Sequence, residues 1–453
     1  MYGAEENLEE VAMLSKKPPE DKYYAVYLFI LLNGIGTLMP WNMFITIAPS
    51  YYVNYKFVEV DADGAVHKTD YALHFLSYLG LASQLPTLLL NLTNLFIQIK
   101  GGLRRRIGSS LIVLAIITLA TLIFTLVDTS KMITTFFIIT MVTVVILNAA
   151  NGIYQNSLYG LTASFPPHYT NALILGNNIC GTFVSVMSII TLVEDSDKKE
   201  AVASENIITG VELVGSGSEM NKFGEITESQ KVLQSSFKAK LKLYFEKGKR
   251  CFYCLSLSIN FQIKVQCFNV WCVFFVTLTL FPTTMADIRY YSESGKYDFI
   301  IPEKLFISIT TYLLFNFFAV VGSFLANFVQ WPSQKWLIFP VVARIIFIPL
   351  MIFCNFRPEY RTWNIWIYNV WIYIALAVVM SITSGYFSSL AMMYAPRALF
   401  RIVEPSKSAA AGMIAAFFLM FGITSGIMFT LIVSWFTDSA GPYLPGTFKT
   451  MMS

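Results

Sequence analysis

Charged residues are scarce in this sequence. Asp, Glu, Lys and Arg make up 13% of its 453 residues, against about 25% in a typical soluble domain. Apolar residues make up 55%, and the mean hydropathy is +0.58. These values exclude an ordinary soluble domain and are typical of a polytopic membrane protein.

Histidines and paired cysteines are also lacking. The three histidines are His67, His74 and His168, so a metal centre or a catalytic triad lacks its side chains. The lone C-x-x-C at Cys251 and Cys254 has no second pair to complete a zinc site, and the six cysteines form no disulfide framework. We therefore expect no enzyme activity, no metal and no cofactor. A net charge of +4 without a concentrated basic patch excludes nucleic acid as a partner.

Long apolar runs fill the rest of the chain. A helix needs roughly 20 residues to cross about 30 Å of hydrocarbon, and lipid offers the backbone no hydrogen-bond partner, so each run is expected to be helical. The predicted fold class is an all-α polytopic helical bundle. The clear windows lie near residues 24–48, 72–98, 107–127, 132–160, 171–193, 267–287, 305–330, 336–355, 366–395 and 409–436, which makes ten spans.

Basic residues in short loops predict the orientation of these spans. Lys22 precedes the first window, Arg104 to Arg106 lie between the second and third, and Arg401 lies between the last two. These positions place the N-terminus inside and the C-terminus outside, which requires an odd number of crossings. The polar first 23 residues lack the pattern of a cleavable signal, so we expect the first span to direct insertion.

The missing crossing falls in residues 194–266. This stretch is acidic and polar at first and then strongly basic, and its last apolar run is too short for a full span. Two interpretations stay open: the chain lacks one helix relative to a working transporter, or a poor helix is carried across by its neighbours. The expected division is a tail (1–23), a first bundle (24–193), this loop with a missing or degenerate sixth span (194–266), a second bundle (267–436) and a C-terminal tail (437–453).

Amide side chains recur inside the spans, where each needs a partner helix or an aqueous path. Asn148, Asn151, Gln155 and Tyr159 follow a spacing of three to four residues and therefore line one stripe of a helix. Hydrogen bonding between helices is the default interpretation for single amides such as Asn33 and Asn327. For the dense stripe we favour a cavity that accepts neutral polar cargo, because amides both donate and accept hydrogen bonds. Further span amides are Asn42, Gln84, Asn91, Asn94, Asn177 and Asn178.

Buried acids are nearly absent from the windows. A proton pump or ion-coupled carrier usually needs a chain of intramembrane acids, so the sequence favours a carrier that moves its substrate down a gradient. Arg344 is the main charge inside a window, and we expect it to reach the membrane surface or to form a cytoplasmic latch. Pro40, Pro86 and Pro282 predict kinks or hinges, and Gly422 with Gly426 predicts close helix packing.

Several motifs in order resemble the equilibrative nucleoside transporters (solute carrier family 29). They are GIGTLMPWNMFIT (34–46), NGIYQNSLYGL (151–161), LFP (280–282), ARIIFIPLMIFCN (343–355), SGYFSSL (384–390) and AAGMIAAFFLMFG (410–422). The resemblance implies a major-facilitator-like fold of eleven helices, with the sixth falling in the deficient stretch. It also implies sodium-independent facilitated diffusion of nucleosides.

The resemblance also implies roles for individual residues. Leu38 and Trp41 would pack near the nucleobase, Gln155 would hydrogen-bond its edge, and Asn42 would be a structural or cavity amide. Gln84 and Asn151 occupy two further positions of the site, and Asn151 replaces a glycine that in some members accompanies sensitivity to nucleoside-analogue inhibitors, so we expect weak inhibition by such compounds. An external gate would involve Ile45, Pro282, Tyr312 and Asn316, of which Asn316 also contributes to the substrate site.

One departure from the family pattern concerns the ribose. Many members carry D-x-x-G-R in the helix after the seventh, and its Asp and Arg contact the ribose hydroxyls. Here the segment is AVVGS, which puts Ala319 and Ser323 at those positions. Loss of a charged pair weakens binding of a cargo that used it, so nucleobases or deoxynucleosides become plausible substrates, with Ser323 as the remaining polar contact.

The sequence therefore predicts a monomeric facilitative carrier of nucleosides, and of nucleobases as well, in the plasma membrane. Its partners would be the small-molecule substrate and the lipid bilayer. Two alternatives remain: a non-transporting or impaired variant that lacks one helix, and an organic-cation carrier of the same family. A cation site should contain a buried acid or an aromatic cage, and the fifth span has no such acid.

Overall fold

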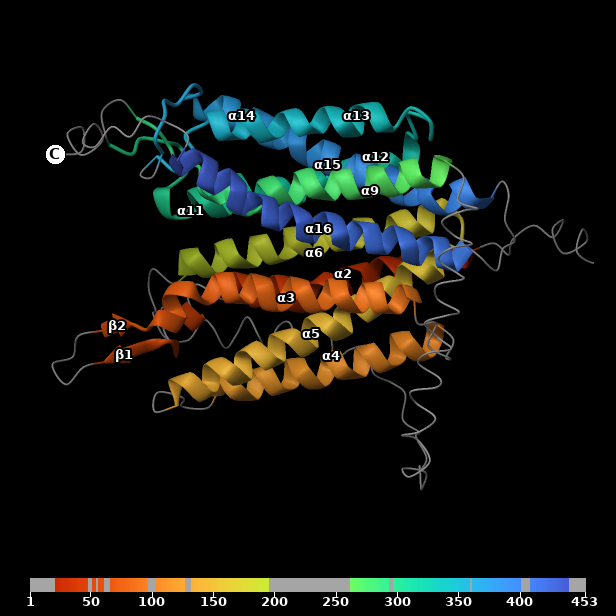
Figure 1. The fold of residues 1–453 in the computed structure, drawn as a ribbon, viewed down its shortest axis with the longest axis horizontal. Coiled ribbons are helices and arrows are strands. Elements are labelled where there is room, and N and C mark those ends of the chain that lie inside the picture. The colour runs from red at the N-terminus through yellow and green to blue at the C-terminus, as the bar shows by residue number, and fades with distance from the viewer. Residues whose placement is uncertain are drawn as a thin grey trace, which may run out of the picture.

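Long helices lie side by side in the computed structural model (Figure 1). The structure describes residues 21–47, 51–53, 56–60, 66–96, 103–126, 132–194, 261–292, 296–358, 361–400 and 408–439. We call the end of the bundle where α4 and α16 begin the inner end, and the end where α16 finishes the outer end. The loop charges predict that the inner end is cytoplasmic.

The first helical group comprises the helices before residue 195. It contains α2 (Ala25–Ile47), α3 (Asp70–Phe96), α4 (Leu103–Leu126), α5 (Ile133–Thr162) and α6 (Pro167–Glu194), after a short 3-10 turn η1 (Lys22–Tyr24). α3 and α4 pack on α5, and α2 packs along α6. Gly34 and Gly176 bring the last pair into backbone contact, because a Cβ at Gly34 would meet the carbonyl of Leu173.

The second helical group follows residue 260. It contains α9 (Phe261–Leu280), α10 (Thr283–Ala286), α11 (Glu303–Ile307), the π-helical turn η3 (Ser308–Leu313), α12 (Leu314–Phe328), α13 (Ile338–Ala343), the 3-10 turn η4 (Arg344–Ile346), α14 (Phe347–Phe353), α15 (Val370–Phe400) and α16 (Ser408–Ser439). The GxxxG pair lies where α16 crosses α9: a Cβ at Gly422 would lie 2.6 Å from the carbonyl oxygen of Trp271, and one at Gly426 would lie 2.6 Å from that of Phe275. Close packing at this pair was predicted from the sequence.

All ten apolar windows form helices, and eight described helices are long and apolar enough to cross a membrane. The two windows outside these eight are α3, which carries Pro86 and several amides, and the shorter run Ile338–Phe353. The protein is therefore an all-helical, multi-pass membrane protein, although the number of ten spans stays a prediction. The predicted sixth crossing lies outside the described residues.

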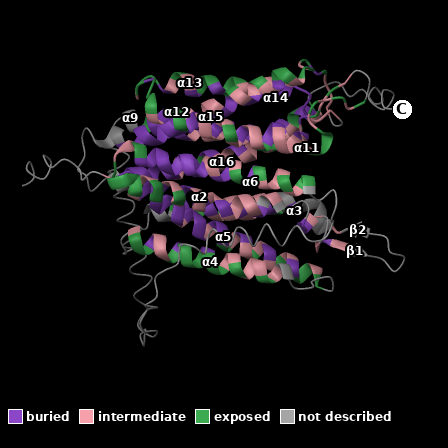
Figure 2. Ribbon diagram, turned by 180° about the vertical axis from the view of Figure 1, so that it is seen from behind, coloured by how far each residue is buried: buried purple, intermediate pink, exposed green. Residues whose placement is uncertain are grey.

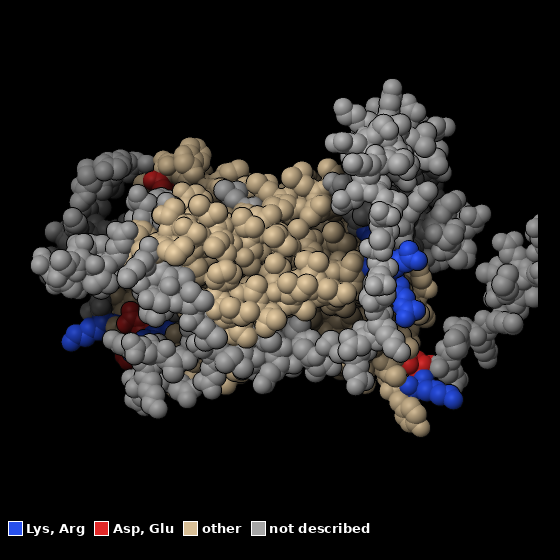
Figure 3. Space-filling model, turned by 90° about the horizontal axis from the view of Figure 1, so that it is seen from below, with Lys and Arg blue, Asp and Glu red and all other residues tan. Residues whose placement is uncertain are grey.

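Charges on the described surface gather toward the two ends of the helices. On the face shown in Figure 3, Lys and Arg predominate at one end beside an acidic patch, a few acidic and basic residues lie at the other end, and the described surface between them carries neither. Large apolar side chains are exposed along α4, including Ile112, Ile116 and Leu119, and Figure 2 shows that buried residues concentrate on helices nearer the centre. This distribution fits a bundle whose apolar belt contacts lipid.

A small β-hairpin at the outer end was missed by the sequence analysis. β1 (Val58–Val60) pairs antiparallel with β2 (Val66–Lys68) between α2 and α3. An aromatic cluster packs beside this connection, and its rings include Phe44, Tyr52, Phe57, Phe75 and Phe136. The cluster joins α2, α3 and α5 at this end.

Arg344 lies deep inside the second helical group, so the expectation that it reaches the membrane surface was wrong. Its side chain is 2% exposed. It donates to the carbonyl oxygens of Val273 (3.1 Å) and Met380 (3.5 Å) and to Thr277 Oγ1 (3.0 Å). The guanidinium therefore connects η4 to α9 and α15, and neutral acceptors replace water around the charge.

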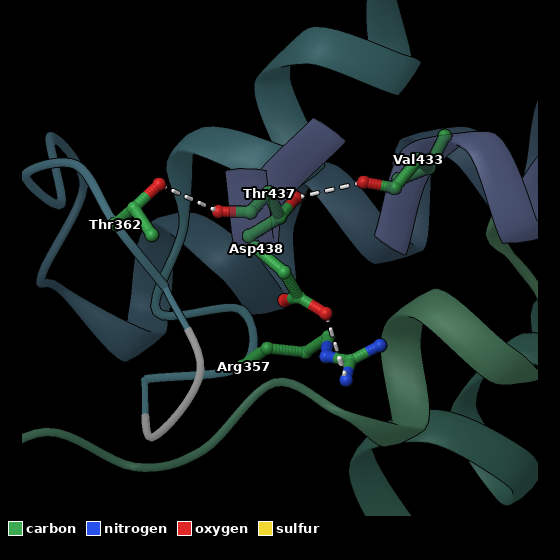
Figure 4. A network of polar contacts seen from close by, with 5 residues as sticks. All are labelled: Arg357, Thr362, Val433, Thr437 and Asp438. Carbon is green, nitrogen blue, oxygen red and sulfur yellow. Dashed lines mark hydrogen bonds and ion pairs between the residues drawn. The ribbon is translucent and has the colours of Figure 1, made fainter. Parts of the chain in front are cut away.

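A loop between α14 and α15 is bonded to the outer ends of α14 and α16. Arg357 forms an ion pair with Asp438 at the end of α16 (3.2 Å), and Thr362 Oγ1 donates to the carbonyl of Thr437 (3.3 Å; Figure 4). Arg361 donates to the carbonyls of Ile352 (3.0 Å) and Cys354 (2.8 Å), which lie at the end of α14. Burial lowers the pKa of Arg361 to about 10, so it stays charged at neutral pH and stabilises the negative end of that helix.

Candidate functional site

The amide stripe of α5 is buried and partly without hydrogen-bond partners. Asn148, Asn151 and Gln155 are 6%, 8% and 3% exposed. Within the part of the chain that the structure describes, Asn151 Oδ1 and Gln155 Oε1 accept no hydrogen bond. A buried acceptor without a donor is costly, so these two oxygens are candidate contacts for a cargo that brings its own N–H or O–H groups.

A chain of polar contacts lies next to the stripe and joins three helices. Thr37 Oγ1 on α2 donates to Asn177 Oδ1 on α6 at 2.6 Å. Asn177 Nδ2 in turn donates to the hydroxyl of Tyr159 on α5 at 3.5 Å, one helical turn beyond Gln155. Asn177 and Tyr159 stand out in the sequence as a span amide and a member of the stripe, whereas the only sequence signal of Thr37 is a hydroxyl inside an apolar span.

The α2 residues of the predicted site face different neighbours. Leu38 packs against the small cluster of Met39, Cys180 and Val184, and Asn42 Nδ2 lies 3.6 Å from Cys180 Sγ. Both therefore face α6. Trp41 instead packs against the outer aromatic cluster.

The structure gives fewer contacts for the side chains of two further predicted residues, Gln84 of the substrate site and Ile45 of the gate. Gln84 is half-buried on α3, the helix that packs on α5. Ile45 belongs to α2, but its side chain lies outside the described residues. The structure therefore places Asn151 and Gln155 one turn apart on the same helix, and packs Leu38 and Asn42 against α6.

Ala319 and Ser323 lie in a tight contact of α12 with α15 and α6. Their side chains are 1% and 0% exposed. Ser323 Oγ donates to the carbonyl of Gly385 on α15 (3.1 Å) and accepts from Asn178 Nδ2 on α6 (2.7 Å). Ser323 therefore links the two helical groups, and its donor is already engaged.

The predicted gate residues of the second helical group lie close together at the outer half. Phe281, next to Pro282, stacks on Phe315 (ring centroids 3.8 Å apart) and meets Tyr312 edge-on (5.9 Å). Tyr312 belongs to the π-helical turn η3, and such turns are frequent at functional sites.

Asn316 connects this gate region to the first helical group. Its Nδ2 donates to Ser185 Oγ on α6 (3.1 Å) and to the carbonyl of Tyr312 (3.0 Å), and its side chain lies against Gly181.

The two helical groups also meet at the inner end, where α5 contacts α16. Asn156 Nδ2 donates to the carbonyl of Met413 (3.3 Å). Gly412 faces the same turn, and a Cβ there would lie 2.6 Å from Ala163 Cβ and closer still to the carbonyl of Tyr159. The two backbones approach this closely because residue 412 has no side chain.

A second contact at the inner end joins α6 and α2 to α12. Asn171 Nδ2 donates to Asn327 Oδ1 and to the carbonyl of Ser323, both at 2.8 Å, and Asn327 Nδ2 donates to the hydroxyl of Tyr27 (3.4 Å). Asn33 accepts from the hydroxyl of Tyr154 (2.7 Å). Asn33 and Asn327 therefore make the helix-to-helix hydrogen bonds expected of single amides.

The start of α2 is tied to the start of α6 through Asp21. Its carboxylate accepts from the N–H groups of Val26 and Tyr27 and from the hydroxyl of Tyr169. Partial desolvation alone would raise the pKa of Asp21, but these hydrogen bonds and nearby His168 lower it below its ordinary value. Among the described residues, no group of three or more His, Cys, Asp or Glu side chains is placed to hold a metal ion.

Comparison with known proteins supports the resemblance. The nucleoside transporter family model matches residues 141–214 and 204–436, which is more than half of the chain. Human equilibrative nucleoside transporter 1 is 26% identical over 93% of this chain and 99% of its own length. Rat equilibrative nucleoside transporter 3 is 25% identical over 90% of this chain and 88% of its own length.

Two more distant proteins are also similar. Equilibrative nucleotide transporter 1 of Arabidopsis thaliana is 23% identical over 93% of this chain and 88% of its own length. The E. coli fucose:proton symporter FucP aligns in structure with a TM-score of 0.45 and 12% identity, over 92% of this chain and 91% of its own. The family match over residues 141–436 decides the assignment: this chain belongs to the nucleoside transporter family.

Proposed function

We propose that the protein is a monomeric facilitative carrier that equilibrates nucleosides, and nucleobases as well, across the plasma membrane without sodium. The observation that carries this proposal is the pair of buried acceptors on α5, Asn151 Oδ1 and Gln155 Oε1, in a protein of this family. A nucleobase edge supplies the N–H donors that these oxygens lack.

The charge distribution supports downhill transport. Within the described helices longer than ten residues, the carboxylates Asp70, Glu194 and Asp438 lie at helix ends. Arg344 lies inside the apolar run Ile338–Phe353, and carbonyl and hydroxyl oxygens surround it. Among the described spans, this leaves no row of buried acids to relay a coupling ion.

Alternating access is the proposed mechanism. The two helical groups, proposed to span residues 24–193 and 267–436, would rock about a central site, with the inner contacts of Gly412 and Asn327 closed when cargo enters from outside. The proposed cargo contacts are Leu38, Trp41, Asn42, Gln84, Asn151, Gln155, Asn316 and Ser323. The proposed outer gate is Ile45, Pro282, Tyr312 and Asn316.

Purified protein in liposomes tests the proposal. We expect faster entry of radiolabelled uridine, adenosine or adenine than into empty liposomes, equal rates in sodium and choline buffers, and faster entry when the liposomes are preloaded with unlabelled cargo. Gln155→Leu should lower uptake at least tenfold, because it removes a hydrogen-bonding side chain from the site. Leu119→Ala on lipid-facing α4 is the matched control and should leave uptake unchanged. Entry no faster than into empty liposomes for all three compounds would overturn the proposal.

A further inference from the structure

Asn91 on α3 is a buried amide whose acceptor is unused. Its side chain is 1% exposed. Asn91 Nδ2 donates to the carbonyl of Thr87, one turn earlier on the same helix (2.9 Å), which identifies the other atom as the oxygen. Within the described residues, Asn91 Oδ1 has no hydrogen-bond partner.

The position of Asn91 relates it to the α5 stripe. Asn91 Nδ2 lies 3.2 Å from the place of a Cβ at Gly152, and Thr87 Oγ1 donates to the carbonyl of Asn148 (3.2 Å). Gly152 directly follows Asn151 and precedes Gln155 by three residues. Asn91 therefore contacts α5 at the same turn as the two residues whose amide oxygens are also without donors.

The contacts of Asn91 do not account for its presence in the core. Its hydrogen bond returns to its own helix, so it joins no two helices, and its oxygen is desolvated without compensation. Asn33 shows the contrast: it donates to the carbonyl of Phe29 and also accepts from the hydroxyl of Tyr154 on another helix. A ligand that donates hydrogen bonds would satisfy the oxygen of Asn91.

We propose that Asn91 is a specificity-determining residue whose Oδ1 accepts an N–H of the cargo base, alongside Asn151 and Gln155, and that this set favours bases with an exocyclic amino group. The inference rests on the proposed carrier function and extends it to the class of cargo. An amino group offers two donors to these acceptors. A keto oxygen at the same place presents lone pairs to amide oxygens, which repel it.

The test compares two cargo pairs that differ at that group: adenosine with inosine, and cytidine with uridine. We expect the protein to favour the amino member of each pair in uptake competition. Asn91→Leu should reduce that preference about tenfold, with thermal stability unchanged or raised, because the substitution removes an unsatisfied acceptor from the core. Asn91→Thr keeps a smaller acceptor and should retain part of the preference.

Asn33→Leu is the matched control, since it removes a half-buried span amide whose nitrogen and oxygen are both hydrogen-bonded. It should lower the melting temperature and leave the cargo preference unchanged. The inference is refuted if Asn91→Leu lowers the melting temperature as Asn33→Leu does. It is also refuted if Asn91→Leu reduces the uptake of the amino member and of the keto member of each pair by equal factors.

A binding measurement separates this inference from the proposed function. Stabilisation of the purified protein by each nucleoside, read as a shift in melting temperature, requires no transport. Suppose that the protein transports no nucleoside, that adenosine stabilises it more than inosine does, and that Asn91→Leu abolishes this difference. The proposed transport function is then refuted, whereas the assignment of Asn91 is supported. Equal stabilisation by both members of each pair would overturn the assignment of Asn91.

Discussion

Replacing Gly412 by alanine should open the inner end of the protein. The added methyl would lie 2.6 Å from Ala163 Cβ and closer to the carbonyl of Tyr159, where no side-chain rotation relieves the clash. α5 and α16 must therefore separate. Such overpacking costs about 1–3 kcal/mol. If the strain falls only on the state with a closed inner end, the equilibrium shifts about 5- to 150-fold toward the state in which that end is open.

A reporter cysteine measures this shift directly. Asn156→Cys places a thiol at the same α5–α16 contact, where residue 156 is 2% exposed. In a background with Cys251 and Cys254 changed to Ser, we expect Gly412→Ala to speed labelling of this thiol by an impermeant maleimide added from the inner side. The described native cysteines, which are Cys180, Cys267, Cys272 and Cys354, are buried.

Gly426→Ala is the matched control for the same reasoning. Its methyl would lie 2.6 Å from the carbonyl oxygen of Phe275, but that contact joins α16 to α9 within one helical group. The strain should then be present in both states, lowering the melting temperature without changing the labelling rate. Equal labelling rates for Gly412→Ala and Gly426→Ala would show that the α5–α16 contact does not open during the cycle, and the rocking mechanism would have to be abandoned.

Three further substitutions have expected outcomes. Asn327→Leu removes two hydrogen bonds between helices, and at about 0.6 kcal/mol each it should favour the inner-open state roughly sevenfold in the same labelling assay; an unchanged rate would contradict this. Arg361→Ala leaves the carbonyls of Ile352 and Cys354 without a cationic donor and should lower the free energy of unfolding by about 2–3 kcal/mol, as read from thermal unfolding in detergent. Arg357→Ala breaks a partly exposed ion pair with Asp438 and should cost at most about 1 kcal/mol, less in high salt; a larger, salt-independent loss would show that the pair is more than a surface contact.

The positions of the helices followed from the sequence because membrane insertion leaves little choice. A run of about 20 apolar residues must bond its own backbone, so the windows became helical, several with similar limits, as at Ile133–Thr162. The α5 stripe was also predictable, since residues spaced at three and four share a helix face. The hairpin Val58–Val60 with Val66–Lys68 was missed because strands of three residues are too short to show alternation.

The contacts of single polar residues could not be predicted in the same way. Arg344 was expected at a surface because an isolated charge in lipid is costly. Three oxygens from α9 and α15 surround it instead, and only the packing of those helices brings the three together. Thr37 and Asn91 resemble other polar span residues in the sequence. Only the structure shows that Thr37 donates to Asn177, and that Asn91 Oδ1 has no hydrogen-bond partner among the described residues.

The two helical groups contribute unequally to the proposed site. The first group holds amide oxygens without donors at Asn151 and Gln155. In the second group, Ala319 is packed against Gly385, and the hydroxyl of Ser323 already donates its hydrogen to the carbonyl of Gly385. For Ser323 to donate to cargo, that bond would have to break, and α12 would have to loosen from α15. In the proposed mechanism, recognition of cargo would therefore rest mainly on α5 and its neighbours, whereas Ser323, through Asn178, connects the two groups and would respond when they move.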